Sequence, residues 1–310
     1  MNSILAITGG TGKKTGGAFI RQLAANREAV GKMFPGGIRA LTRASSDTSR
    51  LTALFPGAEI FPGSMNDAPY LDAALSGVDT VVHIAGIHRS RKLVEAACRQ
   101  GVRRLILMHT TGIYSKYKQA GEAYRQIDAD VYRMCKEHGI VLTILRPTMI
   151  YGNVSDCNVV TFIKMADRFP VMPVVNGARY GLQPVHYEDL GKALCSVLMN
   201  ETATANRDYI LSGKEPILLR DMLAAIGTHL GKNMQFASCP FPVAYAGAWA
   251  LFLLTGKKKD YREKVQRLCE PRVFSHEDAT RDFGYDPVGF EEGVANEVKE
   301  YLSLKKNRSL

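Results

Sequence analysis

The sequence lacks the cysteine patterns that mark disulfide frameworks and structural metal sites. Its six cysteines lie more than twenty residues apart, with no CxxC pair and no cluster of cysteine with histidine. We therefore expect reduced thiols, no bound metal and a cytoplasmic protein. The first residues, MNSILAITGG, carry no basic flank before their apolar run, so a signal or transit peptide is not expected.

A membrane-spanning run is also missing. One apolar stretch, PFPVAYAGAWALFLL (240–254), has fifteen residues with two prolines at its start, whereas a spanning helix needs about 20 residues. We expect it to form a buried helix of a substrate lid or a dimer contact. The lysines at 257–259 keep a helix at a membrane surface as the alternative.

The sequence has fewer acidic than basic side chains. Thirty acidic and forty basic side chains give a formal net charge of +10. Such an excess favours anionic ligands such as phosphates, or an acidic lipid surface, although a solvated basic face would have the same composition. We expect a small-molecule substrate and no nucleic-acid partner.

Short β-branched apolar runs alternate with segments of helical periodicity in the first half of the chain. The expected strands are 3–8, 38–43, a segment near 58, 79–86, 103–109 and 141–147, and the expected helices are 17–30, 69–75, 89–100 and 122–138. This alternation is typical of a doubly wound α/β fold with a parallel sheet.

Longer polar connections begin after Pro147. We expect a nucleotide-binding domain over 1–155, completed by parts of 180–210, and a smaller carboxyl-terminal lobe over 156–310 that binds the substrate.

A glycine-rich loop, TGGTGKKTGG (8–17), follows the first expected strand directly and precedes a helix. Glycines let the backbone approach a pyrophosphate, and the free amides at the helix start donate hydrogen bonds to it. Because a second strand follows about thirty residues on, the loop predicts a dinucleotide site.

With this loop, the chain resembles the short-chain dehydrogenase/reductase superfamily, in particular its extended and atypical branches, which include nucleotide-sugar epimerases, dehydratases and reductases. The other matching segments are VVHIAG (81–86), LTILRPTMIYG (142–152), QPVHYEDL (183–190) and HEDATRDFGYDP (276–287). The resemblance implies a Rossmann-type sheet, an NAD(P) cofactor and commonly a homodimer. The loop departs from the family's TGxxGxxG pattern, because Thr15 takes the third glycine position and Gly16 follows it.

The end of the second expected strand favours NADP over NAD. Thr42 and Arg43 stand where an acidic residue would bind the ribose hydroxyls of NAD, and no acid occurs before Asp47. A guanidinium can pair with a 2′-phosphate, and Lys13 adds charge, whereas we interpret Lys14 as a solvent-facing cation. The residues expected to bind the cofactor are Gly9, Thr11, Gly12, Lys13, Gly16, Arg43, Asn66, Asp67, Ala85, Gly86, Pro147 and Thr148.

The superfamily's catalytic residues are matched in part. In relatives, a serine or threonine after the fifth strand works with a tyrosine and with a lysine one helical turn later, which lowers the pKa of the phenol. Thr110 or Thr111 fits the first role, and HTTGIYSKYK (109–118) contains Tyr114 and Lys118 at the required spacing. These two lie closer to Thr110 than in the family, so a structural role for Tyr114 stays open. Tyr124 is the alternative acid.

Three residues beyond the sixth strand are candidates for substrate binding: Tyr151, Asn153 and Arg179, whose guanidinium suits a diphosphate. We predict an NADP-dependent oxidoreductase or epimerase/dehydratase that acts on a nucleotide sugar or a similar small carbonyl or alcohol. The alternative is a dinucleotide-binding regulatory or interaction protein without standard dehydrogenase chemistry, because no tyrosine–lysine pair occupies the family's frame on the helix.

Overall fold

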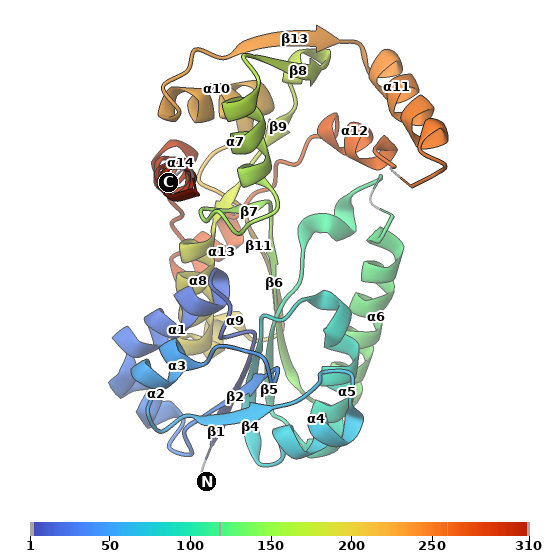
Figure 1. The fold of residues 1–310 in the computed structure, drawn as a ribbon. Helices are drawn as coiled ribbons and strands as arrows, with labels where there is room; N and C mark the ends of the chain where they lie inside the picture. The colour runs from blue at the N-terminus through green and yellow to red at the C-terminus, as the bar shows by residue number, and fades with distance from the viewer. Residues whose placement is uncertain (1–2, 118, 259, 309–310) are drawn as a thin grey trace.

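Seven parallel strands form one sheet in the computed structural model, which describes residues 3–117, 119–258 and 260–308 (Figure 1). Their order is β11-β6-β5-β4-β1-β2-β3, which reverses beside β1. The strands are β1 (Ile4–Thr8), β2 (Ile38–Thr42), β3 (Glu59–Pro62), β4 (Val78–His83), β5 (Arg104–Met108), β6 (Val141–Pro147) and β11 (Arg207–Leu211). The predicted doubly wound α/β sheet is confirmed, and such sheets bind ligands beyond the carboxyl ends of the strands at the reversal.

Helices cover both faces of the sheet (Figure 1). One face carries α1 (Thr15–Ala25), α2 (Arg27–Met33), α3 (Ser49–Leu54), α8 (Tyr187–Met199) and α13 (Glu277–Phe283), and the other carries α4 (Ala68–Leu75), α5 (Ser90–Gln100) and α6 (Gly121–Glu137). Helices α1 and α8 pack closely because Gly191 faces Ala18, and a Cβ on Gly191 would lie 2.5 Å from that of Ala18.

The helix expected over 17–30 is two helices instead. Helix α1 ends at Ala25 and α2 begins at Arg27, with Asn26 between them at φ −111° and ψ 27°. The side-chain amide of Asn26 donates a hydrogen bond to the carbonyl of Gln22 at 2.9 Å. Asparagine side chains compete with the helical ladder in this way, which explains the break.

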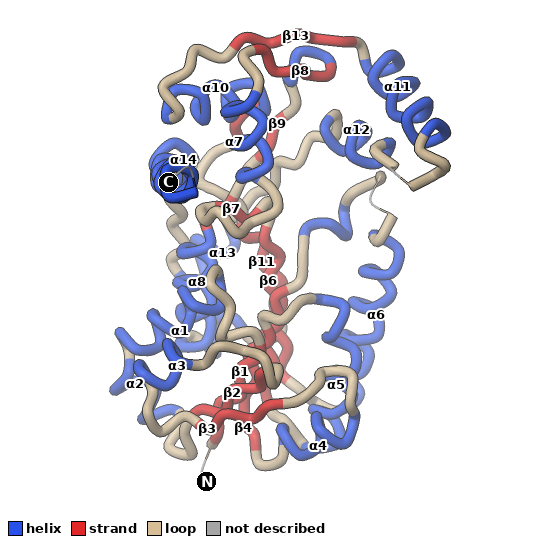
Figure 2. The backbone as a smooth tube through the Cα atoms, in the orientation of Figure 1, coloured by secondary structure: helices blue, strands red, loops and turns tan. Residues whose placement is uncertain are grey.

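A smaller lobe lies above the carboxyl ends of the strands (Figure 2). Helices α7 (Val159–Arg168), α10 (Leu219–His229) and α14 (Phe290–Arg308) enclose an apolar core of its own. Short strands pair within it: β7 (Ile150–Tyr151) with β10 (Val185–His186), β8 (Val171–Val175) with β13 (Gln235–Cys239), and β9 (Gly181–Leu182) with β12 (Ile217–Leu218). The connections contain the 3-10 helices η1 (Ile87–Arg89), η2 (Thr111–Tyr114) and η3 (Asn176–Ala178) and the short α9 (Glu201–Thr204).

Helix α11 (Phe241–Leu254) stands at the outer edge of this lobe, beside α12 (Arg262–Leu268) (Figure 1). Within α11 only Ala248 is buried, whereas Val243 and Leu254 are 61% and 85% exposed. The apolar run therefore does form a helix, and within the single chain this helix is largely exposed rather than buried. Its expected role as a dimer contact stays a prediction. No helix in the described ranges is long and apolar enough to cross a membrane.

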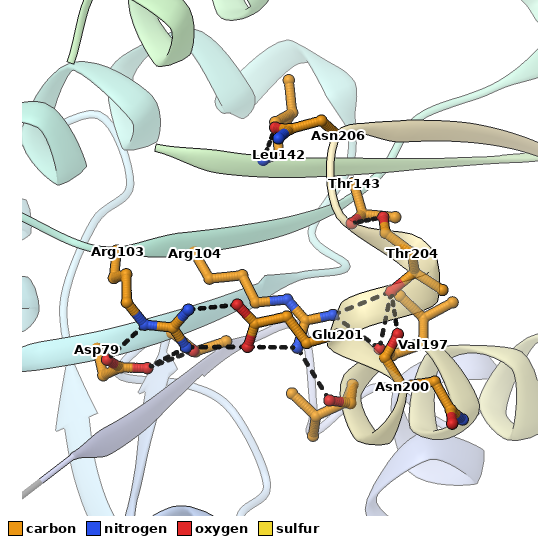
Figure 3. A network of polar contacts seen from close by, with 12 residues as sticks. Asp79, Arg103, Arg104, Leu142, Thr143, Val197, Asn200, Glu201, Thr204 and Asn206 are labelled. Atoms are coloured by element: carbon orange, nitrogen blue, oxygen red, sulfur yellow. Dashed lines mark hydrogen bonds and ion pairs between the residues drawn. The ribbon is translucent and has the colours of Figure 1, made fainter. Parts of the chain in front are cut away.

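A buried arginine fastens α8 and α9 to the amino end of β5 (Figure 3). The guanidinium of Arg104 donates hydrogen bonds to the carbonyls of Leu198 at 2.9 Å and Val197 at 2.7 Å, and to the hydroxyl of Thr204 at 3.2 Å. The last carbonyls of a helix have no partner within it, so Arg104 satisfies acceptors that α8 leaves open.

Candidate active site

The glycine loop between β1 and α1 has no room for a side chain at Gly9 or at Gly16. Gly9 has a φ of +77°, and a Cβ there would lie 3.0 Å from the amide nitrogen of Ala85. A Cβ on Gly16 would lie 2.0 Å from the carbonyl oxygen of Gly9. Gly16, rather than the residue at 15, thus allows the close packing of helix on loop. This cradle before α1 fits the pyrophosphate of a dinucleotide.

A cavity of about 490 Å³ opens beside the loop. Met65, Tyr70 and Arg89 line it and were not predicted, whereas the predicted Asn66 and Asp67 are exposed and lie outside its lining. The segment 63–67 therefore borders the cavity through residues other than those expected. The predicted residues that do line it are Gly9, Thr11, Gly12, Lys13, Arg43 and Ala85.

Both signs of charge occur in this cavity. Arg43 and Lys13 bring positive charge to the end of β2, as a 2′-phosphate requires. Asp47 lines the same cavity, and hydrogen bonds from Ser49 hold the pKa of its carboxyl below the ordinary 3.8. The cavity thus offers cations for a phosphate and a carboxylate for a ribose hydroxyl.

A second cavity, of about 390 Å³, lies between the ends of β5 and β6 and the carboxyl-terminal lobe. The predicted residues Thr110, Tyr114 and Thr148 line it together with Lys14 from the glycine loop. Lys14 is half-buried, and its ammonium donates a hydrogen bond to the carbonyl of Ser155 at 3.2 Å. This contact is solvent-exposed, so Lys14 is a surface cation that also lines the cavity, and the cavity joins the glycine loop to the catalytic candidates.

Tyr114 ends the 3-10 turn that follows β5. The turn starts at Thr110, whose hydroxyl accepts the N–H of Gly112 at 2.9 Å. The ring of Tyr114 packs against Phe274 with 5.8 Å between centroids, and partial burial raises the pKa of the phenol above its ordinary 10.0. Tyr114 is thus a protonated phenol at the cavity, which is the state of a general acid.

The other two residues predicted for catalysis are the lysine partner of Tyr114 and the alternative acid. Lys118 lies outside the described residues. Tyr124, the alternative acid, sits on α6 with 9% exposure and lines neither cavity, and its ring contacts His88 at 5.0 Å between centroids. Tyr114 is therefore the candidate tyrosine that reaches the second cavity.

A carboxylate from the carboxyl-terminal lobe holds the Tyr114 turn. Glu270 is 8% exposed and accepts hydrogen bonds from the hydroxyl of Ser115 at 2.6 Å and the N–H of Lys116 at 2.8 Å. No spacing in the sequence could indicate this contact, because 155 residues separate Ser115 from Glu270. The position of the turn depends on both lobes.

A chain of buried polar groups runs behind the same turn. His109 contacts Asp128 through Nδ1 at 2.6 Å and Ser90 through Nε2 at 2.9 Å, and Asp128 pairs with Arg146 at 2.6 Å. Burial opposes ionisation of Asp128, but the hydrogen bond with His109 and the charge of Arg146 bring its pKa below 3.8. Asp128, one turn after Tyr124, therefore fastens α6 to β5 and β6.

Two of the residues predicted to bind the cofactor accept hydrogen bonds within the protein through their backbone carbonyls. The carbonyl of Pro147 accepts the hydroxyl of Thr111 at 3.1 Å. Gly86 has a φ of +98°, and its carbonyl lies 3.1 Å from Nε2 of His83. Burial lowers the pKa of His83 to about 3, so a neutral imidazole fixes the turn after β4.

The residues predicted to bind substrate do not line the second cavity. Tyr151 is 0% exposed, and its ring packs against His186 and Phe290 at 5.3 and 5.0 Å between centroids. Asn153 closes its own turn by accepting a backbone N–H two residues on, and Arg179 is exposed. Tyr151 is thus a core residue of the lobe.

Two arginines that the sequence analysis did not predict lie at the end of α12 and just after it, beside the second cavity. Arg267 and Arg272 line it, and the Nε atom of each is shielded from solvent without a hydrogen-bond partner in the described part of the chain. Burial and the nearby charge of Arg267 lower the pKa of Arg272 to about 10. Glu263 lies 3.8 Å from the guanidinium of Arg267 and the charge of Glu270 acts on Arg272, and an anionic group in the cavity would add to this partial compensation.

Two carboxyl groups meet behind the loop that follows β7. Asp156 accepts the N–H of Asn158 at 2.6 Å, and Glu297 on α14 accepts the N–H of Gly152 at 2.8 Å. Glu297 is 0% exposed, and burial with the neighbouring Asp156 raises its pKa to about 9. A neutral Glu297 thus bridges α14 to a loop that lines the second cavity through Asn158.

The reversed strand order, the glycine cradle and the cavities beyond the strands define a dinucleotide-binding fold of the short-chain dehydrogenase/reductase type. The model of the NmrA-like family matches residues 1–247, and the chain belongs to that family.

Named relatives are reductases and epimerases. The chain is 25% identical over 275 residues to 2-alkyl-3-oxoalkanoate reductase of Stenotrophomonas maltophilia (strain K279a), covering 75% of this chain and 83% of the relative. It is 24% identical over 254 residues to N-acetyl-alpha-D-glucosaminyl-diphospho-ditrans,octacis-undecaprenol 4-epimerase of Escherichia coli O157:H7, covering 71% and 75%.

Solved structures support the fold. A dTDP-glucose 4,6-dehydratase of Streptomyces venezuelae with NAD bound superposes with a TM-score of 0.70 at 18% identity, covering 97% of both chains. An NADPH-dependent quinone oxidoreductase of Escherichia coli in complex with NADPH superposes with a TM-score of 0.68 at 18% identity, covering 94% of this chain and 98% of the other. The expected superfamily is confirmed.

Proposed function

We propose that this chain is an NADP-dependent oxidoreductase that reduces the carbonyl group of a small anionic substrate, with nucleotide sugars as the favoured class. The observation that carries the proposal is the second cavity, where Lys14 of the glycine loop, the hydroxyl-bearing Thr110 and the phenol of Tyr114 line one space. This arrangement supports chemistry at the end of a bound dinucleotide.

The glycine cradle and α1 would hold the pyrophosphate, because Gly9 and Gly16 leave the backbone open to it. Arg43 and Lys13 would take the 2′-phosphate in the first cavity. When bound, NADPH supplies a hydride to the substrate carbonyl carbon.

Tyr114 would donate its proton to the carbonyl oxygen as the hydride arrives. Partial burial raises the pKa of the phenol above its ordinary 10.0, so Tyr114 carries the proton that a general acid donates. Thr110 would orient the same oxygen by a hydrogen bond, and Glu270 would hold the turn that carries Tyr114. The product is the alcohol, and the cofactor leaves oxidised.

Arg267 and Arg272 favour an anionic substrate. Both side chains line the cavity that Tyr114 also lines, and the Nε atom of each is buried without a hydrogen-bond partner among the described residues. A diphosphate presents several acceptor oxygens to such a pair. These two arginines replace Arg179 as our candidates for diphosphate binding.

A panel assay tests the proposal. The protein is incubated with NADPH and either keto nucleotide sugars or matched carbonyl compounds that lack phosphate, and nicotinamide absorbance is followed. We expect NADPH consumption that is faster with the phosphorylated compounds. Conversion without net NADPH consumption would indicate epimerase or dehydratase chemistry, and tight NADPH binding without any conversion would indicate a regulatory dinucleotide-binding protein.

A further inference from the structure

The outer face of α11 is apolar. A surface helix normally turns polar residues to water, and the less exposed residues of α11, at 241, 244, 245, 248 and 252, follow helical spacing as expected. The opposite side nevertheless carries Val243, Trp249, Leu253 and Leu254, with exposures of 61%, 50%, 45% and 85%. Residues 241–254 include no charged side chain. A continuous apolar surface of this kind marks an interaction site.

Positive charge follows this face directly. Residues 255–264 include five basic and two acidic side chains, and Lys257, Lys258 and Lys264 are exposed. The guanidinium of Arg262 lies over the ring of Phe252 at 4.2 Å from the centroid, which holds the start of α12 against α11. The basic residues therefore stay beside the apolar face.

We propose that α11 docks on the surface of a bilayer that contains anionic phospholipids. The apolar face would enter the region between headgroups and acyl chains, while the lysines would meet the phosphates. Fourteen residues make a helix of about 21 Å, whereas the hydrocarbon core is about 30 Å thick, so α11 lies at the surface and does not cross it. Trp249, on the exposed face, belongs to the residue types enriched at such interfaces.

Charge favours a lipid surface over a second copy of this chain. A second copy would bring the same lysines and the same net charge of +10 to the contact, whereas an anionic bilayer complements both. This inference does not depend on the proposed catalytic activity.

Trp249 reports on docking directly, because it is the single tryptophan of the chain and is 50% exposed. The full chain is titrated with vesicles of phosphatidylcholine alone or with phosphatidylglycerol. We expect a blue shift of tryptophan emission, quenching by brominated acyl chains and flotation with the anionic vesicles. An unchanged spectrum and no flotation with either vesicle would overturn the proposal.

Double variants separate the contribution of the apolar face to vesicle binding from that of the lysines. Leu253→Glu with Leu254→Glu should weaken vesicle binding by about a hundredfold, because the variant loses the free energy of burying two apolar side chains in the lipid. Leu302→Glu with Leu304→Glu is the matched control, since these leucines of α14 are 39% and 43% exposed and lie outside the proposed face. This control should bind as the unmodified chain does.

The charge contribution is tested with Lys257→Glu and Lys258→Glu, which should lower binding to anionic vesicles by about twentyfold or more. Lys164→Glu with Lys306→Glu, two exposed lysines elsewhere, should have a much smaller effect. Circular dichroism checks that every variant folds. If the Leu253 and Leu254 variant instead converts a dimer into a monomer in ultracentrifugation, and the unmodified chain ignores vesicles, the face is an interface between copies and the proposal is wrong.

Discussion

Tyr114 owes its position to contacts from both lobes. Its turn is started by Thr110, held by Glu270 through the next two residues, and covered by Phe274. None of these contacts lies on the helix where relatives place their tyrosine. The letters of HTTGIYSKYK identify a candidate acid, but its relation to the cavity follows from residues more than 150 positions away.

Replacing Tyr114 by phenylalanine removes the proposed proton donor and little else. We expect kcat to fall by about 10²–10⁴-fold, with the Kd for NADPH unchanged. Tyr117→Phe is the matched control, because Tyr117 is exposed, close in sequence and outside the cavity lining. Steady-state kinetics and a fluorescence titration with NADPH measure both effects. Unchanged turnover in Tyr114→Phe would remove this residue from the mechanism.

In our account Arg43 determines the preference for NADPH over NADH. Arg43→Ala should raise the Kd for NADPH by about ten- to a hundredfold, because one charge-assisted contact to the 2′-phosphate is lost. Binding of NADH should stay within about twofold, since it has no such phosphate and Asp47 remains. Calorimetric titration with both cofactors measures this. An equal loss for both would mean that Arg43 supports the fold of the loop instead.

At the scale of elements, the sequence predicted most strands and helices closely, because hydrophobic periodicity and glycine punctuation are local signals. Strand β6 begins and ends at the expected residues, 141 and 147. The break at Asn26 was missed because it depends on one side-chain hydrogen bond. The exposure of α11 was missed because an apolar run alone does not say whether other elements cover it.

The packing of α1 on the glycine loop gives a direct test. Gly16→Ala places a Cβ against the carbonyl of Gly9, so we expect a loss of about 1–3 kcal/mol of stability and at least about tenfold weaker NADPH binding. Gly31→Ala on α2 has open space around its Cβ and should stabilise by about 0.5–1 kcal/mol. Denaturant unfolding and NADPH titration compare the two.

The Asp156 and Glu297 pair links α14 to the loop after β7 and makes stability depend on pH. Folding raises the pKa of Glu297 from 4.5 to about 9, so its contribution is full below pH 4.5 and is lost as the pH rises toward 9. Stability should fall by up to about 1.4 kcal/mol per pH unit in this window.

Glu297→Gln keeps an acceptor for the N–H of Gly152 and cannot ionise. Its unfolding free energy should therefore fall less than that of the unmodified chain between pH 5 and pH 9, as measured by denaturant unfolding at several pH values. Parallel pH profiles for the two proteins would show that Glu297 is not held neutral.

At the scale of the whole molecule, Arg104 and Arg103 are adjacent residues with different roles. Arg104 is 0% exposed and bonds to carbonyls of α8, whereas the half-exposed Arg103 pairs with Asp79 and Glu201 (Figure 3). Arg104→Met should cost about 3 kcal/mol, because buried acceptors lose their donor. Arg103→Met should cost less than about 1 kcal/mol. Equal losses in denaturant unfolding would contradict this assignment.

The meeting of the two lobes was the part that the sequence could not predict. Lys14, Arg267, Glu270 and Arg272 reach the second cavity from segments some 250 residues apart, and no local pattern marks them. The glycine loop could be predicted because residues that are adjacent in the sequence determine its geometry. Tyr151 was assigned to substrate for its place after β6, although its side chain points into the core of the lobe.

Transfer of deuterium from NADPH labelled at the nicotinamide C4 tests the central claim most directly. Each keto nucleotide sugar of the panel is incubated with the labelled cofactor, using both C4 epimers, and the products are examined by mass spectrometry. We predict an alcohol that carries a single deuterium from one of the two epimers, formed much more slowly by Tyr114→Phe. A protein that binds NADPH tightly but transfers no deuterium to any carbonyl compound would contradict the account.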